Sequence, residues 1–176
     1  SVDNAALVFE QSAAGTYSGS LTGSGTLTVH GAGLLTFTGN SGAFAGETRL
    51  AAGMLEVGTA ATTNASLGGT IGILDGGVLS GHGTVGTVNN FVGTVQPGGT
   101  IGTLTVTGNY TQSASSTLAI EVNPQTSSQL KVGGAASLAG TLAISYDPGT
   151  YHPTTYTFLT APTITGAFDT ITIAGT

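Results

Sequence analysis

The chain alternates apolar and polar residues over many short runs, with glycine between them. Leu27 and Val29 alternate with threonines, and the same pattern returns at Leu35 and Phe37. A period of two with β-branched residues is typical of strands that bury one face. The pattern predicts short strands within residues 25–31, 33–39, 47–58 and 71–83.

Residues 81–112 carry the densest series of such runs, at residues 84–88, 91–96, 101–107 and 109–112. No gap between them is long enough for a helix, and no helical period bounded by caps occurs elsewhere. We expect the core of this stretch to be lined by Val85, Val88, Val92, Val95, Leu104 and Val106. We expect corners, where a Cβ does not fit, at Gly98, Gly99, Gly102 and Gly108.

An imperfect period indicates how the strands are arranged. Leucines recur at positions 35, 55, 79 and 104, at intervals of 20, 24 and 25 residues. Such a period, with glycine turns, is typical of a solenoid. A sandwich or closed barrel is the alternative, but it usually shows hairpin turns, and Asp75-Gly76 is the one clear candidate. We therefore predict an all-β fold, a parallel β-helix.

The last third of the chain differs in composition from the repetitive part before it. Strand-like runs continue at residues 117–122, 129–132 and 141–146, and three prolines and several aromatic residues follow them. An open solenoid end exposes unpaired strands, and bulky or edge-breaking residues commonly cover such an end. We predict β-helix rungs over residues 1–112 and a less regular β cap over 113–176, continuous with the coil. Tyr110 and Phe158 are expected to close this cap.

Composition narrows the functional classes. Hydrophobic residues make up 39% of the 176 positions and charged residues only 6%, so we expect folded structure despite 30 glycines. The only cations are Arg49 and Lys131, too few to neutralise phosphates, which argues against nucleic-acid binding. Cysteine is absent, which excludes disulfides and thiol sites. No apolar run reaches 18 residues, so we expect no membrane insertion by this segment.

Motifs for cofactors and metals are weak. Residues 81–86 match G-x-G-x-x-G, but a strand-like run follows where a nucleotide site needs a helix. Residues 68–76 resemble a calcium-binding repeat with the aspartate displaced, and the pattern does not recur. The three histidines are too far apart for a zinc motif. We predict no cofactor and no metal site.

Catalytic residues are also not indicated. Ser80, His82 and Asp75 could form a hydrolase triad in principle, but a polar turn exposed to solvent is the favoured interpretation. The densest charged cluster comprises Glu47, Arg49 and Glu56. A solvated surface pair is favoured there over acid–base catalysis, which requires converging carboxylates. We therefore expect no enzyme activity and no catalytic residue.

Several stretches together resemble one protein family. Residues 23–58 (GSGTLTVHGAGLLTFTGNSGAFAGETRLAAGMLEVG) resemble the passenger-associated repeat of bacterial autotransporters, the type V secretion proteins. Residues 79–122, which begin LSGHGTVGTVNNFVGTVQPGG, resemble the start of the pertactin-like passenger C-terminus. Residues 129–145 and 156–170 follow in the order typical of the family. The resemblance covers about residues 23–170.

The resemblance implies a right-handed parallel β-helix on the bacterial cell surface or outside the cell. In this family the C-terminal part of the passenger, called the autochaperone region, folds first outside the outer membrane and helps to draw the rest of the passenger across. The implied partners are an upstream passenger and a C-terminal outer-membrane β-barrel translocator, so the chain would be a non-enzymatic stem.

Two alternative functions remain open. One is an adhesin that binds a host protein or glycan or mediates self-association between cells; the other is a β-helix polysaccharide-acting enzyme or esterase.

Overall fold

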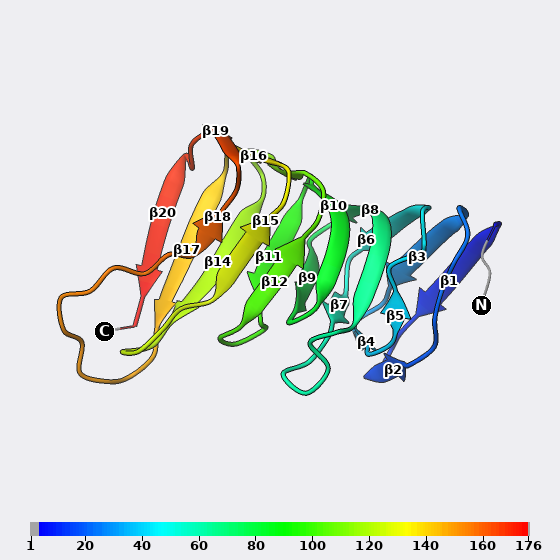
Figure 1. Ribbon diagram of the computed structural model, residues 1–176, viewed down its shortest axis with the longest axis horizontal. Helices are drawn as coiled ribbons and strands as arrows, with labels where there is room; N and C mark the ends of the chain where they lie inside the picture. Colours follow the sequence, from blue (N-terminus) through cyan, green and yellow to red (C-terminus); the bar gives the residue numbers. More distant parts are fainter. Residues whose placement is uncertain (1–3, 176) are drawn as a thin grey trace.

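A computed structural model describes residues 4–175, and their regular structure consists of strands wound into one coil (Figure 1). The first five turns comprise β1 (Ala6–Glu10), β2 (Gly15–Tyr17), β3 (Thr26–His30), β4 (Leu34–Phe37), β5 (Asn40–Ser41), β6 (Glu47–Ala51), β7 (Met54–Val57), β8 (Ser66–Leu74), β9 (Gly77–Gly81), β10 (Thr84–Asn90) and β11 (Gly93–Pro97). The last three comprise β12 (Thr103–Val106), β13 (Tyr110–Gln112), β14 (Thr117–Val122), β15 (Gln129–Val132), β16 (Ala135–Leu138), β17 (Thr141–Tyr146), β18 (Leu159–Thr160), β19 (Thr163–Gly166) and β20 (Thr170–Ala174). Within residues 4–175 no helix is long and apolar enough to cross a membrane.

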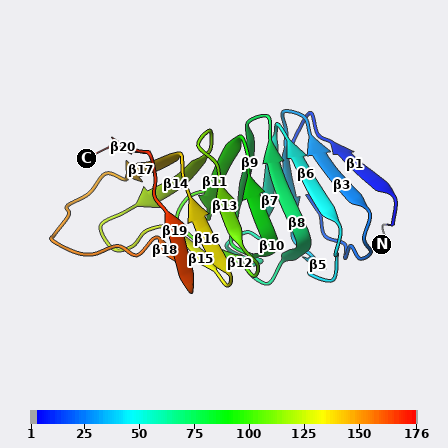
Figure 2. The same cartoon turned by 90° about the horizontal axis from the view of Figure 1, so that it is seen from above.

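Every pairing between these strands is parallel, which confirms the predicted parallel β-helix. An eight-stranded sheet has the order β2-β4-β7-β9-β11-β14-β17-β20. The main path of a 12-stranded sheet is β1-β3-β6-β8-β10-β12-β15-β18. Strands between the two ends therefore pair mostly with strands one turn earlier and one turn later, and Figure 2 shows successive turns following one another along the molecule. Asp75-Gly76 joins β8 to β9 at a corner between the two sheets and not within a hairpin.

The larger sheet forks at β10. The first part of β10 pairs with β12, where Val85 lies opposite Val106. The second part pairs with β13, where Val88 lies opposite Tyr110. One long strand thus gives way to two short strands, which residues 107–109 separate. From this point each turn has three strands, and β13, β16 and β19 form the third row.

The interior is built from columns of side chains that stack in register. Because alternate residues of a strand point to one face, the inward residues of one turn lie over those of the next. One column in the smaller sheet runs through Leu35, Leu55, Leu79, Val95, Leu118 and Leu142. A second, in the larger sheet, runs through Leu27, Thr48, Ile71, Val88, Tyr110 and Ala136. All of these side chains are buried.

The columns correct one detail of the predicted period. Leu79 is followed by Val95 in its column, whereas Leu104 lies in β12 and stacks on Leu130 in the larger sheet. The turns differ in length because their corners differ: 16 residues separate Leu79 from Val95 (95 − 79) and 23 separate Val95 from Leu118 (118 − 95). A leucine periodicity read from sequence cannot follow such a change.

The parallel ladders continue beyond residue 112, through β14, β17 and β20. The last turn is nevertheless not closed. Ile164, Ile171 and Ile173 point along the interior columns yet are 49%, 61% and 64% exposed. Aromatic side chains of the predicted cap do pack, partly buried, against the core: Tyr151, Tyr156, Phe158 and Phe168.

Candidate functional site

Five of the six predicted core residues line the interior of the coil. Val88, Val95, Leu104 and Val106 are fully buried, and Val85 is almost so. They come from β10, β11 and β12, the strands on either side of the fork. Fully burying such an aliphatic side chain contributes roughly 1.5–3 kcal/mol.

The prediction for Val92 is wrong, because this side chain is 47% exposed. β10 ends at Asn90 and β11 begins at Gly93, so Phe91 and Val92 form the corner between them. The Val92 carbonyl oxygen accepts a hydrogen bond from the Gly76 amide (2.7 Å) in the corner one turn earlier. Backbone pairing with the earlier corner leaves both apolar side chains of this corner directed outward.

Tyr110 does not close an end of the coil. It lies in the middle of an interior column, between Val88 and Ala136, and is fully buried. Burial raises the pKa of its hydroxyl above the ordinary value. Phe158 lies just before β18, packs partly buried against the core, and accepts a hydrogen bond from the Leu130 amide (2.8 Å) at its carbonyl oxygen.

The four predicted corner glycines differ in what they require. Gly98 and Gly99 have φ values of 80° and 70°, a left-handed conformation that glycine adopts without strain. A Cβ on Gly98 would lie 2.3 Å from the Gly102 backbone nitrogen, whereas Gly99 has open space. Gly102 and Gly108 are required by close packing instead: a Cβ there would lie 2.5 Å from the His82 ring and 2.2 Å from Thr87 Oγ1.

The structure does not assemble a triad from Ser80, His82 and Asp75. Asp75 precedes β9 and His82 follows it, so the two residues lie at opposite ends of the strand. His82 Nδ1 is buried and has no hydrogen-bond partner among the described residues. Without a carboxylate that accepts its proton, the imidazole is not oriented as a general base.

The acidic and basic candidates lie on different faces. The carboxylate of Glu47 and the guanidinium of Arg49 form an ion pair at 3.3 Å on β6, with both side chains about half exposed. Glu56 lies on β7, in the other sheet, and accepts a hydrogen bond from the Thr36 hydroxyl (3.1 Å). Exposed pairs of this kind contribute little stability. They do not converge with Asp75 on a shared groove.

The glycine motifs belong to the coil. Residues 81–86 run from the end of β9 into β10, and residues 68–76 lie in β8 and the corner after it. No group of three or more potential metal ligands occurs among residues 4–175. The phosphate-binding helix that a nucleotide motif requires is replaced here by a strand.

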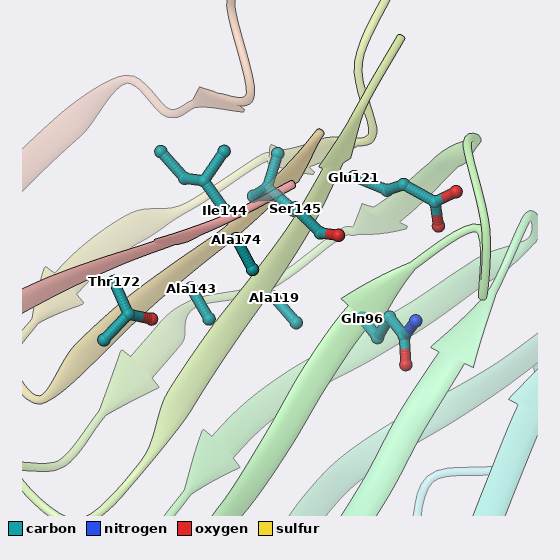
Figure 3. Close-up of a pocket in the computed structure, with 9 residues that line it drawn as sticks. Gln96, Ala119, Glu121, Ala143, Ile144, Ser145, Thr172 and Ala174 are labelled. Atoms are coloured by element: carbon teal, nitrogen blue, oxygen red, sulfur yellow. The ribbon is translucent and has the colours of Figure 1, made fainter. Parts of the chain in front are cut away.

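One groove does exist, on the outer face of the smaller sheet at the C-terminal turns (Figure 3). It has a volume of about 240 Å³ and is lined by Gln96, Ala119, Ile120, Glu121, Ala143, Ile144, Ser145, Thr172 and Ala174. Figure 3 shows Thr172, Ala143, Ala119 and Gln96 in one line across the strands. The small side chains on adjacent turns leave a shallow trough with polar groups around it.

Glu121 is the titratable group of this groove. Desolvation and the neighbouring Asp147 raise the pKa of Glu121 above its ordinary value. Asp147 opens the 147–158 loop, in which the Tyr151 hydroxyl shares its one proton between the carbonyl oxygens of Val122 (2.9 Å) and Asp147 (2.7 Å). Since the pair consists of two acids, the groove favours uncharged or cationic groups over anions.

The feature that the sequence prediction missed is polar and internal. Asn90 and Gln112 are 1% and 2% exposed and lie opposite each other on β10 and β13. The alternation itself carried the signal, because Asn90 follows Val88, and Gln112 follows Tyr110, at the inward spacing of two. An amide in such a position is buried and must find hydrogen-bond partners within the coil.

No protein-family model matches the chain, and no curated protein sequence matches it.

Proposed function

We propose that this chain is a C-terminal β-helix segment of a bacterial autotransporter passenger. In this role it is a non-enzymatic stem at the cell surface whose folding helps to bring the passenger across the outer membrane. The observation that carries the proposal is one uninterrupted parallel coil in which the family-like stretches lie in order. Residues 23–58 include β3 to β7, residues 79–122 reach the end of β14, and residues 129–145 include β15 and β16.

Two further properties support the proposal. The chain has no cysteine and few charges, so neither disulfides nor clustered charge would hinder passage through a pore unfolded. The edges of β1 and β2 that face away from β3 and β4 are free in the described residues. A free parallel edge can align the next strand added to it, so an upstream passenger could continue the ladder from there.

Leu104→Asp tests the folding role in the bacterium that makes the protein. Leu104 is fully buried in β12, and an unpaired carboxylate there is expected to unfold the surrounding turns. We expect loss of most of the cell-surface signal, measured with an antibody on intact cells and compared with the total protein. Thr105→Asp is the matched control, because it adds the same charge to the outer side of the same strand.

The outcome separates folding from export. If Leu104→Asp unfolds the purified chain in urea titrations while surface display and protease resistance stay unchanged, the folding of this segment does not serve export. Equal loss of display in both variants would indicate an effect of charge on the pore, and it would also contradict the proposal.

A second candidate is an adhesin surface, favoured by the outer face of the smaller sheet. Thr94, Thr117, Thr141 and Thr170 stack in register, each two residues before a residue that lines the groove. Such a row offers hydroxyl groups at the spacing of neighbouring strands, about 4.8 Å. Saturable binding of the purified chain to host-cell protein or glycan, lost on Thr117→Ala with Thr141→Ala, would favour this function. Thr105→Ala on the other sheet is the control.

A further inference from the structure

The apolar pattern of the C-terminal strands does not by itself determine their register. β14 and β17 both begin Thr-Leu-Ala-Ile, and the structure pairs each residue with its counterpart. Sliding β17 by two residues would place Leu118 opposite Ile144 and still keep apolar side chains inside. Strands of this kind are prone to slip, because only a one-residue shift exchanges the two faces.

Asn90 binds the beginning of β14. Its Nδ2 group donates to the carbonyl oxygens of Gly93 (3.2 Å) and Thr117 (3.3 Å), and Thr117 is the first residue of β14. In the opposite direction, the Ser116 hydroxyl donates to the Asn90 carbonyl oxygen at 2.7 Å. These bonds join the corner of one turn to the first residue of the strand in the next turn.

Gln112 repeats this arrangement one turn later. It lies opposite Asn90, and its Nε2 group contacts the carbonyl oxygens of Ala139 (2.9 Å) and Thr141 (3.0 Å). Thr141 is the first residue of β17, as Thr117 is of β14. The Nε2 group also reaches the Ser116 carbonyl oxygen (3.3 Å) within its own turn.

The orientation of the Gln112 amide is held from the other side. The Tyr110 hydroxyl donates to Gln112 Oε1 at 2.6 Å, and both side chains are buried. Since the oxygen is engaged by this donor, the nitrogen must face the carbonyl oxygens of the next turn. The buried tyrosine thereby selects one of the two flip states of the amide.

We propose that Asn90 and Gln112 are the register-determining residues of the C-terminal turns. The amide group of each residue binds the carbonyl group of the first residue in the smaller-sheet strand of the next turn, Thr117 or Thr141.

In a regular strand a two-residue slip would replace one carbonyl group by an equivalent one. Gln112, however, binds the carbonyl groups of Ala139 and Thr141 together, on either side of the Gly140 corner (φ 67°). A slip of β17 would move this corner and leave the buried amide without one of its acceptors, which is costly. A single buried polar residue selects register in coiled coils by the same reasoning. This inference concerns the purified chain and does not depend on a role in secretion.

The absence of cysteine makes the register directly measurable. Thr117→Cys with Thr141→Cys places two thiols on register partners on the outer face. Thr117→Cys with Ala143→Cys, or Ala119→Cys with Thr141→Cys, instead reports a slip of two residues in either direction. Directly opposite residues allow a disulfide and displaced residues do not. Disulfides formed under mild oxidation are quantified by peptide mass spectrometry.

Gln112→Met is the test variant, since it keeps the length of the side chain and removes the amide. We expect the ratio of slipped to native disulfide to rise about tenfold, which corresponds to the loss of one buried hydrogen-bonding group. Leu118→Ala is the matched control, because it destabilises β14 through a cavity and leaves the amides in place. This control should unfold at lower urea while its disulfides remain native.

Two results would overturn the inference. One is a native disulfide pattern in Gln112→Met together with reduced stability, which would make the amide an ordinary stabilising group. The other is an equal rise of slipped disulfides in Leu118→Ala, which would attribute slipping to general weakening. If Gln112→Met does not fold, Tyr110→Phe removes only the donor that orients the amide. An unchanged disulfide ratio in that variant would count equally against the inference.

Discussion

One interior column has an aliphatic half and a polar half. In the N-terminal turns it passes through Val29, Leu50 and Ile73, all buried. In the next two turns the same positions hold Asn90 and Gln112. The coil continues through the exchange, so stacking of backbone ladders does not require apolar side chains at every inward position. Both ends of the Gln112 amide have hydrogen-bond partners, whereas Asn90 Oδ1 has none among the described residues.

The exchange coincides with a change in cross-section. Before β10, the larger sheet has one long strand for most of its turn, and β10 is followed by the pair β12 and β13. The carbonyl groups that the two amides bind do not belong to the corner added between β12 and β13; they lie in the corners that lead into β11, β14 and β17. The amides therefore bind the connections from the larger sheet to the smaller sheet.

The two ends of the molecule differ as well. At the N-terminal end, the rings of Phe9, Tyr17 and Phe37 pack together with centroids 5.0–6.0 Å apart. At the other end, Ile171 and Ile173 remain mostly exposed. The first turns therefore end in a cluster of rings, whereas the last turn leaves aliphatic side chains exposed.

Exchange of a residue between the halves should have the largest effect. Ile73→Asn places in the aliphatic half the residue that the next turn carries at Asn90. The aliphatic contacts are lost, and a polar amide takes the place of a fully buried apolar side chain. We expect a loss of roughly 3–5 kcal/mol in the free energy of unfolding, measured by urea denaturation. A loss below that of Ile73→Ala would show that the N-terminal turns accommodate amides equally well.

A smaller effect is expected from the open end. Ile120 and Ile173 occupy the same column two turns apart, but only Ile120 is buried. Ile120→Ala should cost about 2–5 kcal/mol, because it leaves a cavity. Ile173→Ala should cost less than about 1 kcal/mol. Both are measured by urea denaturation of the purified chain, and equal losses would mean that the last turn is covered in solution.

The smallest effect on stability is expected from replacing one glutamate in each half of the coil, Glu121 or Glu47. Since the folded state raises the pKa of Glu121, the folded chain holds that proton to higher pH than the unfolded chain does. This contribution to stability is present at low pH and is lost as the pH rises above the ordinary carboxyl range, about pH 4–5. Glu121→Gln should therefore flatten the decrease in thermal stability between pH 4 and about pH 7. Glu47→Gln, beside Arg49, is the control and should not; a parallel decrease in both variants would contradict the assignment.

The strands themselves were largely predictable from local pattern. The runs at 117–122, 129–132 and 141–146 coincide with β14, β15 and β17, because alternation and flanking glycines are local signals. The short strands β16 and β19 were missed, since four residues of mixed character carry little periodicity. Their pairing with β13 and with each other provides what their sequence does not.

The site residues divide along the same line. The period of two correctly predicted five core residues, four valines and one leucine. The prediction for Val92 was wrong, because Val92 lies in a corner and not in a strand. The groove of Figure 3 combines side chains from β11, β14, β17 and β20, which lie far apart along the chain. A local sequence pattern cannot predict this groove, because its small residues become neighbours only when successive turns stack.

Short strands with glycine corners and one apolar face, wound as a parallel coil, could be predicted from the order of the residues alone. The strands and corners depend on residues within a few positions of one another, where period, propensity and turn chemistry act. Three features required the folded coil: which residues share a column, that Leu79 is followed by Val95, and that Asn90 and Gln112 meet inside. Each of these depends on the lengths of intervening corners, which add up along the chain and are settled only when successive turns pair.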